Sequence, residues 1–191
     1  MVFGLFGRRN RNAEIVERLY VAVADAARRP GFFAELGAPD TVEGRFEMVT
    51  LHAHLAVRRL RALPAPGPDL GQDLVDAVFA HFDAALRELG VGDISVPKKM
   101  KTMASAFLGR AKAYEEALTQ PAQRRGDALR AALLRNVWNN QPGREAAARR
   151  LSAWVEEAVA ALEKAGFDDF VAGRVAFPPL AGAERPAEHS A

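Results

Sequence analysis

The stretch DISVPKKMKTMASAFLGRAKAY, from Asp93 to Tyr114, decides the fold class of this chain. Pro97 suits the first turn of a helix, because its missing N–H would have no intrahelical partner there. After it, apolar residues recur at intervals that place them on one side of a helix with about 3.6 residues per turn. They are Met100, Met103, Phe107, Ala111, Tyr114 and Leu118. The spacing predicts a long amphipathic helix.

The other side of this predicted helix is cationic and contains a glycine. Five basic residues and no acidic one lie between Asp93 and Glu115. A glycine inside a helix costs about 1 kcal/mol relative to alanine, and small residues let a second helix approach closely. We therefore expect a partner-binding lane on this side, formed by Lys98, Lys101, Ser105, Gly109 and Lys112.

Two other readings of this side stay open. The lysines could form a solvated surface above a buried apolar stripe, as charged residues of an amphipathic helix commonly do. Alternatively, Lys98, Lys99 and Lys101 could contact ribosomal RNA, with binding driven by counterion release. Arg45 is a further candidate outside this helix, either as a tether for Asp40 or as part of the binding surface.

The remainder of the chain also favours helices. Of its 191 residues, 49% are apolar but only 8% aromatic, and the helix formers alanine, leucine, arginine and glutamate dominate. A helix is expected to begin near Asp40, whose spacing to Glu43 is typical of a helix start, and to end before Pro64. Apolar spacing predicts other helices at 13–28, 72–89, 126–138 and 144–164, and a short helical turn at 32–36.

Two segments are expected to be extended. One is the proline-rich connector from Leu63 to Asp69. The other is a C-terminal arm at 167–180, expected to dock through Phe170, Val175 and Phe177. The predicted fold class is therefore all-α, a single-domain bundle of about six to seven helices with an extended C-terminal arm.

Two terminal segments flank this helical domain of residues 13–180. Residues 181–191 are expected to be a disordered tail. Residues 1–12 suit a membrane-surface anchor, with apolar side chains in the interface and arginines at anionic headgroups, although a packed or frayed terminus is the alternative. The residues of this anchor are Phe3, Leu5, Phe6, Arg8, Arg9 and Arg11. No apolar stretch reaches the length of a membrane span, so we expect a cytoplasmic protein, peripheral on the inner membrane.

The sequence lacks the residues on which most catalysis depends. It contains no cysteine, which excludes a thiol nucleophile, a disulfide and a cysteine zinc site. No serine lies in a G-x-S-x-G turn, and no phosphate-binding loop occurs. His52 and His54 lie about 200° apart around a helix and cannot chelate one metal together, although His52 and His81 could meet. We expect no catalytic residue, metal or cofactor; the alternative is a haem-carrying protein that depends on His52.

Two longer blocks resemble a known family. The first is FFAELGAPDTVEGRF from Phe32 to Phe46, continuing to LHAHL at 51–55. The second is LRELGVGDISVPKKMK at 86–101, continuing through AFLGR at 106–110. Together they resemble the ubiquinol–cytochrome c chaperone family in its alphaproteobacterial form, whose members are relatives of the mitochondrial assembly factor for cytochrome b. Leu108 departs from the resemblance, since an aromatic residue is expected there.

The resemblance implies a helical assembly chaperone without enzymatic activity. It implies that the chain binds immature cytochrome b and supports its incorporation into the cytochrome bc1 complex, with no small-molecule substrate. The mitochondrial relatives act with a second assembly factor and contact the ribosome, so both are candidate partners. The alternative function is a helical adaptor that binds the ribosome or RNA through the basic residues.

Overall fold

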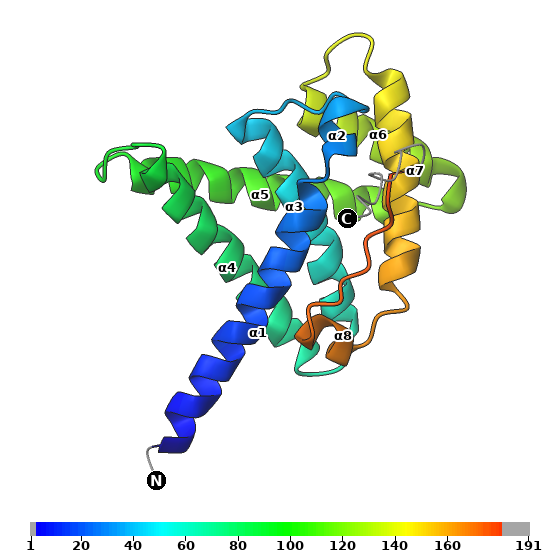
Figure 1. Ribbon diagram of the computed structural model, residues 1–191. Helices are drawn as coiled ribbons and strands as arrows, with labels where there is room; N and C mark the ends of the chain where they lie inside the picture. The colour runs from blue at the N-terminus through cyan, green and yellow to red at the C-terminus, as the bar shows by residue number, and fades with distance from the viewer. Residues whose placement is uncertain (1–2, 181–191) are drawn as a thin grey trace, which may run out of the picture.

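Helix α3 (Val42–Ala62) lies in the middle of the fold (Figure 1). Its central part is buried on every side. Every residue from 46 to 57 is buried, including the polar residues Glu47, Thr50, His52 and His54. A helix that buries its whole circumference needs neighbours all round it. Helices from both halves of the chain pack against α3 and provide them.

The computed structural model describes the backbone of residues 3–180 and the side chains of residues 12–180. Within these residues the fold is helical and has no strand, which confirms the expected all-α bundle. Beside α3 it contains α1 (Phe3–Ala27), α2 (Pro30–Ala34), α4 (Gly67–Glu88), α5 (Val96–Leu118), α6 (Ala122–Trp138), α7 (Glu145–Leu162) and α8 (Phe167–Val171). Because α2 and α8 are only 5 residues each, the long helices carry the fold.

Helices α4 and α5 meet at a short turn and diverge from it (Figure 1), and both contact α3. A row of phenylalanine rings fills the angle between these helices. Phe46 of α3 lies 5.2 Å from Phe82 of α4, centroid to centroid, and Phe79 of α4 lies 5.2 Å from Phe107 of α5. Phe79 and Phe82 are 6.4 Å apart, so the four rings form one continuous contact between α3, α4 and α5.

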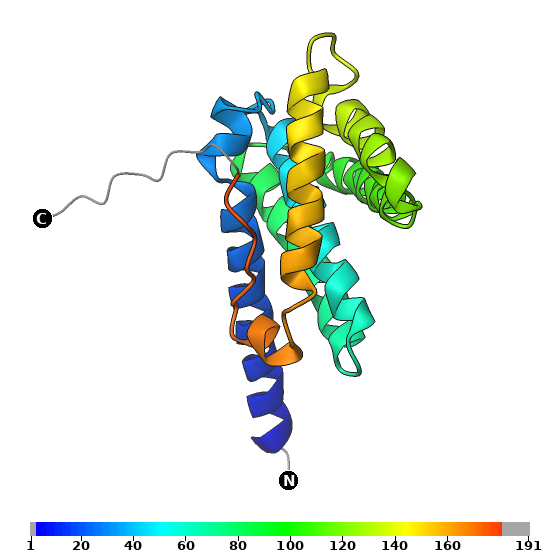
Figure 2. The same cartoon turned by 90° about the vertical axis from the view of Figure 1, so that its right-hand side faces the viewer.

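The C-terminal arm runs back along the bundle between α1 and α7 (Figure 2). Arg29 donates hydrogen bonds to the carbonyl oxygens of Phe177 and Pro178, each at 2.9 Å. The Trp154 indole N–H donates to the Pro178 carbonyl at 3.0 Å. The expected docking of the arm is confirmed, since its three docking residues are buried or half-buried: Phe170, Val175 and Phe177. The expectation that the arm is extended from residue 167 is wrong for its first part, because Phe167–Val171 forms the short helix α8, whose start is capped by the Asp169 carboxylate accepting the Gly166 N–H.

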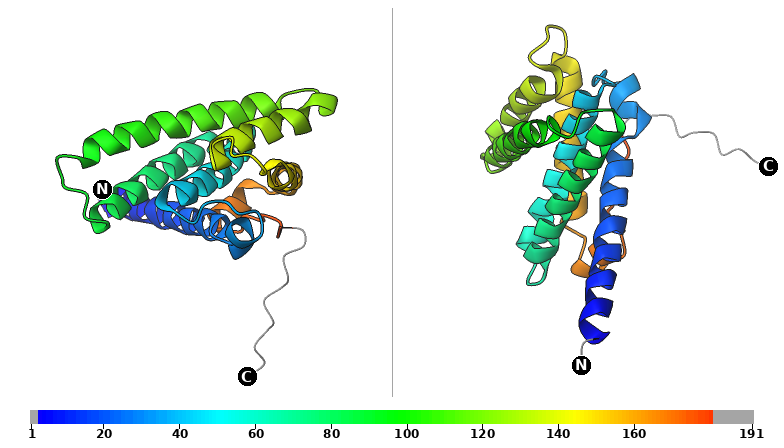
Figure 3. Two further views of the ribbon diagram at one scale, coloured as in Figure 1. Left: turned by 90° about the horizontal axis from the view of Figure 1, so that it is seen from above. Right: turned by 90° about the vertical axis from the view of Figure 1, so that its left-hand side faces the viewer.

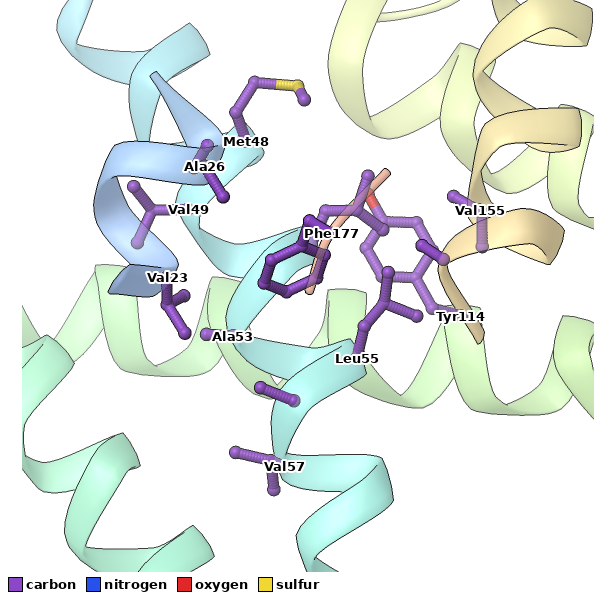
Figure 4. Close-up of a cluster of buried hydrophobic side chains, with 14 of the residues drawn as sticks. Val23, Ala26, Met48, Val49, Ala53, Leu55, Val57, Tyr114, Val155 and Phe177 are labelled. Atoms are coloured by element: carbon purple, nitrogen blue, oxygen red, sulfur yellow. The ribbon is translucent and has the colours of Figure 1, made fainter. Parts of the chain in front are cut away.

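The core is shared by segments far apart in the sequence. In Figure 4, Phe177 of the arm lies among side chains of α1, α3, α5 and α7, which include Val23, Leu55, Tyr114 and Val155. Trp138 and Trp154 are only 1% and 2% exposed, as expected of core residues.

Two helix starts differ from the expectation. The N-cap of α3 is Thr41, whose hydroxyl accepts the Gly44 N–H at 3.1 Å, and Asp40 instead accepts a hydrogen bond from Arg45. Helix α4 begins at Gly67 and leaves only a turn at 63–66 where an extended connector to Asp69 was expected. The reason is that prolines suit a first helical turn, where a missing N–H costs nothing.

Helices α1 and α6 also begin earlier than expected, at Phe3 and Ala122 rather than at 13 and 126. The expected tail at 181–191 lies outside the described residues, as do the side chains of the proposed anchor, of which only the α1 backbone from Phe3 is described.

Candidate functional site

Helix α5 has the two sides that its sequence predicts. Phe107 and Tyr114 are 3% and 0% exposed and face the core. A Cβ built on Gly109 would meet nothing within 4 Å, so no internal contact of the fold requires a glycine there. The predicted lane lies on the exposed side and consists of Lys98, Lys101, Ser105, Gly109 and Lys112.

Most positive charges of this side have no protein partner. Lys112 lies 3.8 Å from Glu116 one turn along the helix, which is a weak exposed ion pair. Within the part of the chain that the structure describes, Lys98, Lys99 and Lys101 make no ion pair. The start of α5 therefore presents three uncompensated lysines to solvent.

A first groove lies on one side of the phenylalanine row, between α1, α3 and α4. Its volume is about 440 Å³, and Phe46 and Phe82 of the row line it. Val42 and Leu89 also line it and are 49% and 62% exposed, so apolar surface is open to solvent there. This groove can accommodate apolar side chains of a partner.

A second groove lies on the other side of the row, between α3 and α5, with α4 also lining part of it. It consists of two adjoining hollows of about 280 and 510 Å³. Both hollows share Val57, His54 and Arg61 from α3 and Leu108 and Ala111 from α5. Leu108 is 65% exposed, so an apolar side chain stands directly beside Gly109 at the edge of this groove.

The charged groups of the second groove form a local network. The Glu115 carboxylate lies 3.2 Å from the Arg58 guanidinium and 3.5 Å from His54 Nε2, which is too far for a strong hydrogen bond. Burial, together with the charges of Arg58 and Arg61, lowers the pKa of His54 to about 4. The imidazole is therefore neutral at neutral pH, and the arginines supply the positive charge of this groove.

The predicted site residues are thus divided between surfaces. Lys112 lines the second groove, whereas Lys98, Lys101, Ser105 and Gly109 line neither groove. Arg45 lines the first groove together with Arg28.

The tether that was one reading of Arg45 is present, since its Nε donates to Asp40 at 2.7 Å. This hydrogen bond lowers the pKa of the Asp40 carboxyl. Both side chains are more than half exposed, so Arg45 remains accessible to a partner.

The fold does not bring His52 and His81 together. His52 is fully buried among the rings of Phe32, Trp154 and Phe177, and burial lowers its pKa to about 3. His81 instead stacks on Tyr20 of α1, so the expectation that His52 and His81 could meet is wrong. Among the described residues, no group of three or more candidate ligands is placed to hold a metal ion, and no helix is long and apolar enough to cross a membrane.

Sequence reasoning missed both grooves. They depend on how far apart α3, α4 and α5 stand in space, which helical periodicity does not reveal. One signal was present, because Leu108 is an apolar residue that falls outside the buried stripe of α5.

Comparisons with known proteins agree on one family. The family model described as ubiquinol-cytochrome C chaperone matches residues 34–177. Among solved structures, the chain is similar to the crystal structure of the Cbp3 homolog from Brucella abortus, with 35% sequence identity and a TM-score of 0.80. That match covers 96% of this chain and 100% of the other. No curated protein matches the chain significantly.

Proposed function

The chain belongs to the ubiquinol-cytochrome C chaperone family, and from that premise we propose that it binds immature cytochrome b and supports its incorporation into the cytochrome bc1 complex. One observation carries the proposal. The exposed side of α5 holds a glycine that the fold itself does not need, next to an exposed leucine and an apolar groove. Such a surface suits a client helix that must be shielded before it is assembled.

In this proposal a client helix lies along α5 and packs closely against Ser105 and Gly109. Its apolar side chains meet Leu108 and enter the second groove, whose lining includes Val57 and Phe107. The lysines at the start of α5 meet acidic or headgroup-level residues at the end of the client helix. Binding and release involve no nucleotide and no covalent step, so the role is not enzymatic.

The test is affinity capture of the tagged protein from detergent-solubilised membranes, washed at moderate salt and analysed by mass spectrometry. We expect cytochrome b with wild type and with Gly109→Ala, and its loss with Gly109→Leu, because the larger side chain fills the lane. Both variants should fold, since the site of the added atoms is open. Capture of cytochrome b by folded Gly109→Leu would remove the lane from the proposal.

A second candidate function, an adaptor that binds the ribosome or RNA, is favoured by Lys98, Lys99 and Lys101, which make no ion pair among the described residues. RNA binding is driven by counterion release and falls steeply with salt, whereas capture of an apolar client does not. Recovery of ribosomal proteins and RNA at low salt only, without cytochrome b, would favour the adaptor. If the protein acts together with a second assembly factor, that factor should also be recovered in the affinity capture.

We further propose that the protein acts as a peripheral protein on the cytoplasmic face of the inner membrane, where its client is inserted. The N-terminal segment of Phe3, Leu5, Phe6, Arg8, Arg9 and Arg11 suits this location by its composition. Flotation with anionic vesicles should be weaker for a chain that lacks residues 1–12. Unchanged flotation would show that the segment is not an anchor.

A further inference from the structure

The turn between α4 and α5, at residues 89–95, presents an apolar side chain that the proposed function leaves unexplained. Of the large apolar side chains that are exposed in the described residues, Val42 and Leu89 line the first groove and Leu108 lines the second. Ile94 lines neither groove and is 97% exposed, more than any other of them. Only Val21 on α1 is similarly outside both grooves, and it is less than half as exposed as Ile94, at 44%.

The turn holds Ile94 in a defined place. The Ser95 N–H donates to the Gly92 carbonyl at 2.7 Å, which closes a tight turn around Ile94. Val96, which follows, is only 1% exposed and fixes the start of α5. The exposed isoleucine is therefore displayed by an ordered turn between two long helices.

The charges near Ile94 that make no ion pair in the described residues are three lysines and one glutamate, so their sum is positive. Its neighbour Asp93 is ion-paired with Arg87, which also binds Asp83 at 2.6 Å. Glu88, at the end of α4, is the other acidic residue near the turn. The lysines at 98, 99 and 101 follow within the first two turns of α5 and make no ion pair in the described part of the chain.

We propose that the α4–α5 turn is a membrane contact, in which Ile94 enters the interface of an anionic bilayer and Lys98, Lys99 and Lys101 bind headgroup phosphates. An apolar side chain beside unpaired lysines is the combination that binds such interfaces. This inference rests on the proposed peripheral membrane association. It adds a second contact point, which is what a marginal anchor needs for stable binding.

The shape of the molecule allows both contacts at once. Seen from above, the N-terminal end of α1 and the α4–α5 turn lie toward the same side of the molecule (Figure 3), while Figure 1 shows them well apart along that side, the first at the bottom and the second at the upper left. A flat bilayer surface along that side can reach both. Lys98 and Lys101 also belong to the proposed client lane, which places the lane beside the bilayer that contains the client.

The test measures binding of the full chain to vesicles of phosphatidylglycerol and phosphatidylcholine. Ile94→Asp should bind at least about tenfold more weakly, because an apolar contact is replaced by a charge of the lipid's own sign. Val21→Asp, which places the same charge at another exposed apolar site, should bind as wild type does. Replacing the three lysines by glutamine should weaken binding by about fivefold for each lysine and reduce its salt dependence.

A fluorescent variant gives a direct readout. In Ile94→Trp the new indole is exposed, whereas Trp138 and Trp154 are buried in the core. We expect its emission to shift to shorter wavelength on vesicle binding and to be quenched by brominated lipids. Both signals should be absent in wild type, whose indoles do not reach lipid.

The outcomes separate this inference from the association on which it rests. Failure of wild type to bind the vesicles overturns both. Binding by wild type that Ile94→Asp does not weaken, with no emission shift in Ile94→Trp, overturns the turn contact and leaves the anchor standing. Loss of cytochrome b capture by Ile94→Asp with unchanged vesicle binding would assign the turn to a protein partner and also overturn the proposal.

Discussion

At the residue scale, two glycines inside helices have opposite surroundings. A Cβ on Gly44, in the first turn of α3, would lie 1.8 Å from the Pro39 carbonyl oxygen, so the chain passes too close for any side chain. A Cβ on Gly109 would meet nothing. The first glycine is therefore required by the fold, and the second is available for function.

Alanine at these two positions should change stability in opposite directions. Gly44→Ala should lower the free energy of unfolding by about 2–3 kcal/mol, since the backbone of the α2–α3 connection must move. Gly109→Ala should raise it by about 0.5–1 kcal/mol, because alanine is the better helix former. Urea unfolding of both variants measures this, and a destabilised Gly109→Ala would contradict the open surroundings of that glycine.

Glu47 and Arg110 form a partly buried ion pair between α3 and α5. Glu47 is 6% exposed on α3 and accepts a hydrogen bond from the Arg110 guanidinium of α5, which also lies 5.5 Å from the Phe46 ring. Burial raises the pKa of the Glu47 carboxyl, although the hydrogen bond from Arg110 acts in the opposite direction. The pair links the proposed client-binding helix to the centre of the fold.

Removing one member of this pair should lower the free energy of unfolding more than removing both members does. Arg110→Met leaves a buried carboxylate without a partner and should cost about 3 kcal/mol at pH 7. The double variant with Glu47→Leu should recover most of that loss, since no charge remains buried. A double-mutant cycle in urea measures the coupling, and additive losses would mean that the two groups do not depend on each other.

At the scale of elements, the C-terminal arm acts as a strap across the bundle. Its Phe177 is 5% exposed and lies with its ring 4.8 Å from that of His52 and 6.2 Å from that of Trp154. Arg29 holds the same stretch through two carbonyl oxygens. The arm therefore closes the core over the polar centre of α3.

Shortening the Phe177 side chain of the arm should open the core near Trp154. Phe177→Ala should lower the free energy of unfolding by about 3–4 kcal/mol and shift tryptophan emission to longer wavelength as water reaches the indole. Pro179→Ala, two residues further at an exposed position, is the matched control and should change neither quantity. Native emission and unchanged stability in Phe177→Ala would contradict the strap.

Helical periodicity predicted the elements well where one apolar stripe dominates. The two sides of α5 and the burial of Phe107 and Tyr114 follow directly from their spacing. Prolines misled the prediction at the start of α4, because a first helical turn and an extended connector share the same residues. The cap of α3 was misplaced by one residue, because Asp40 and Thr41 can both cap and the choice depends on Arg45.

The candidate site was predictable only in part, for a physical reason. The exposure of the lysine lane is a property of one helix, which a sequence pattern can express. The grooves beside α5 are spaces between helices, and they depend on the crossing of α3, α4 and α5 around four phenylalanine rings. Nothing in the spacing along one segment determines that crossing.

At the scale of the whole molecule, the centre of the bundle contains imidazoles that stay neutral. His52 is fully buried, and its Nδ1 lies 2.8 Å from the Met48 carbonyl oxygen. Burial lowers the pKa of His52 to about 3 and that of His54 to about 4. Both histidines thus resist protonation in the folded chain but not in the unfolded one.

Global stability should therefore fall as the pH is lowered from neutral. Below the usual histidine pKa of about 6.5 the unfolded chain binds protons that the folded chain cannot bind. The contribution of the two histidines to the free energy of unfolding is therefore fully present above about pH 6.5. It declines as the pH falls toward 4, by up to about 1.4 kcal/mol per pH unit for each histidine. Glu47 opposes this at the acidic end, since its raised pKa lets the folded chain keep a proton that the unfolded chain has released.

Urea unfolding at pH 7.5, 6.5 and 5.5 measures this slope in the range where the histidines dominate. His54→Gln, which removes one of the two groups while keeping a polar side chain of similar size, should reduce the slope by about half. A free energy of unfolding that does not change between pH 7.5 and 5.5 would mean that the two imidazoles can bind protons without unfolding. The centre of α3 would then be open to water, and the arm would not seal it.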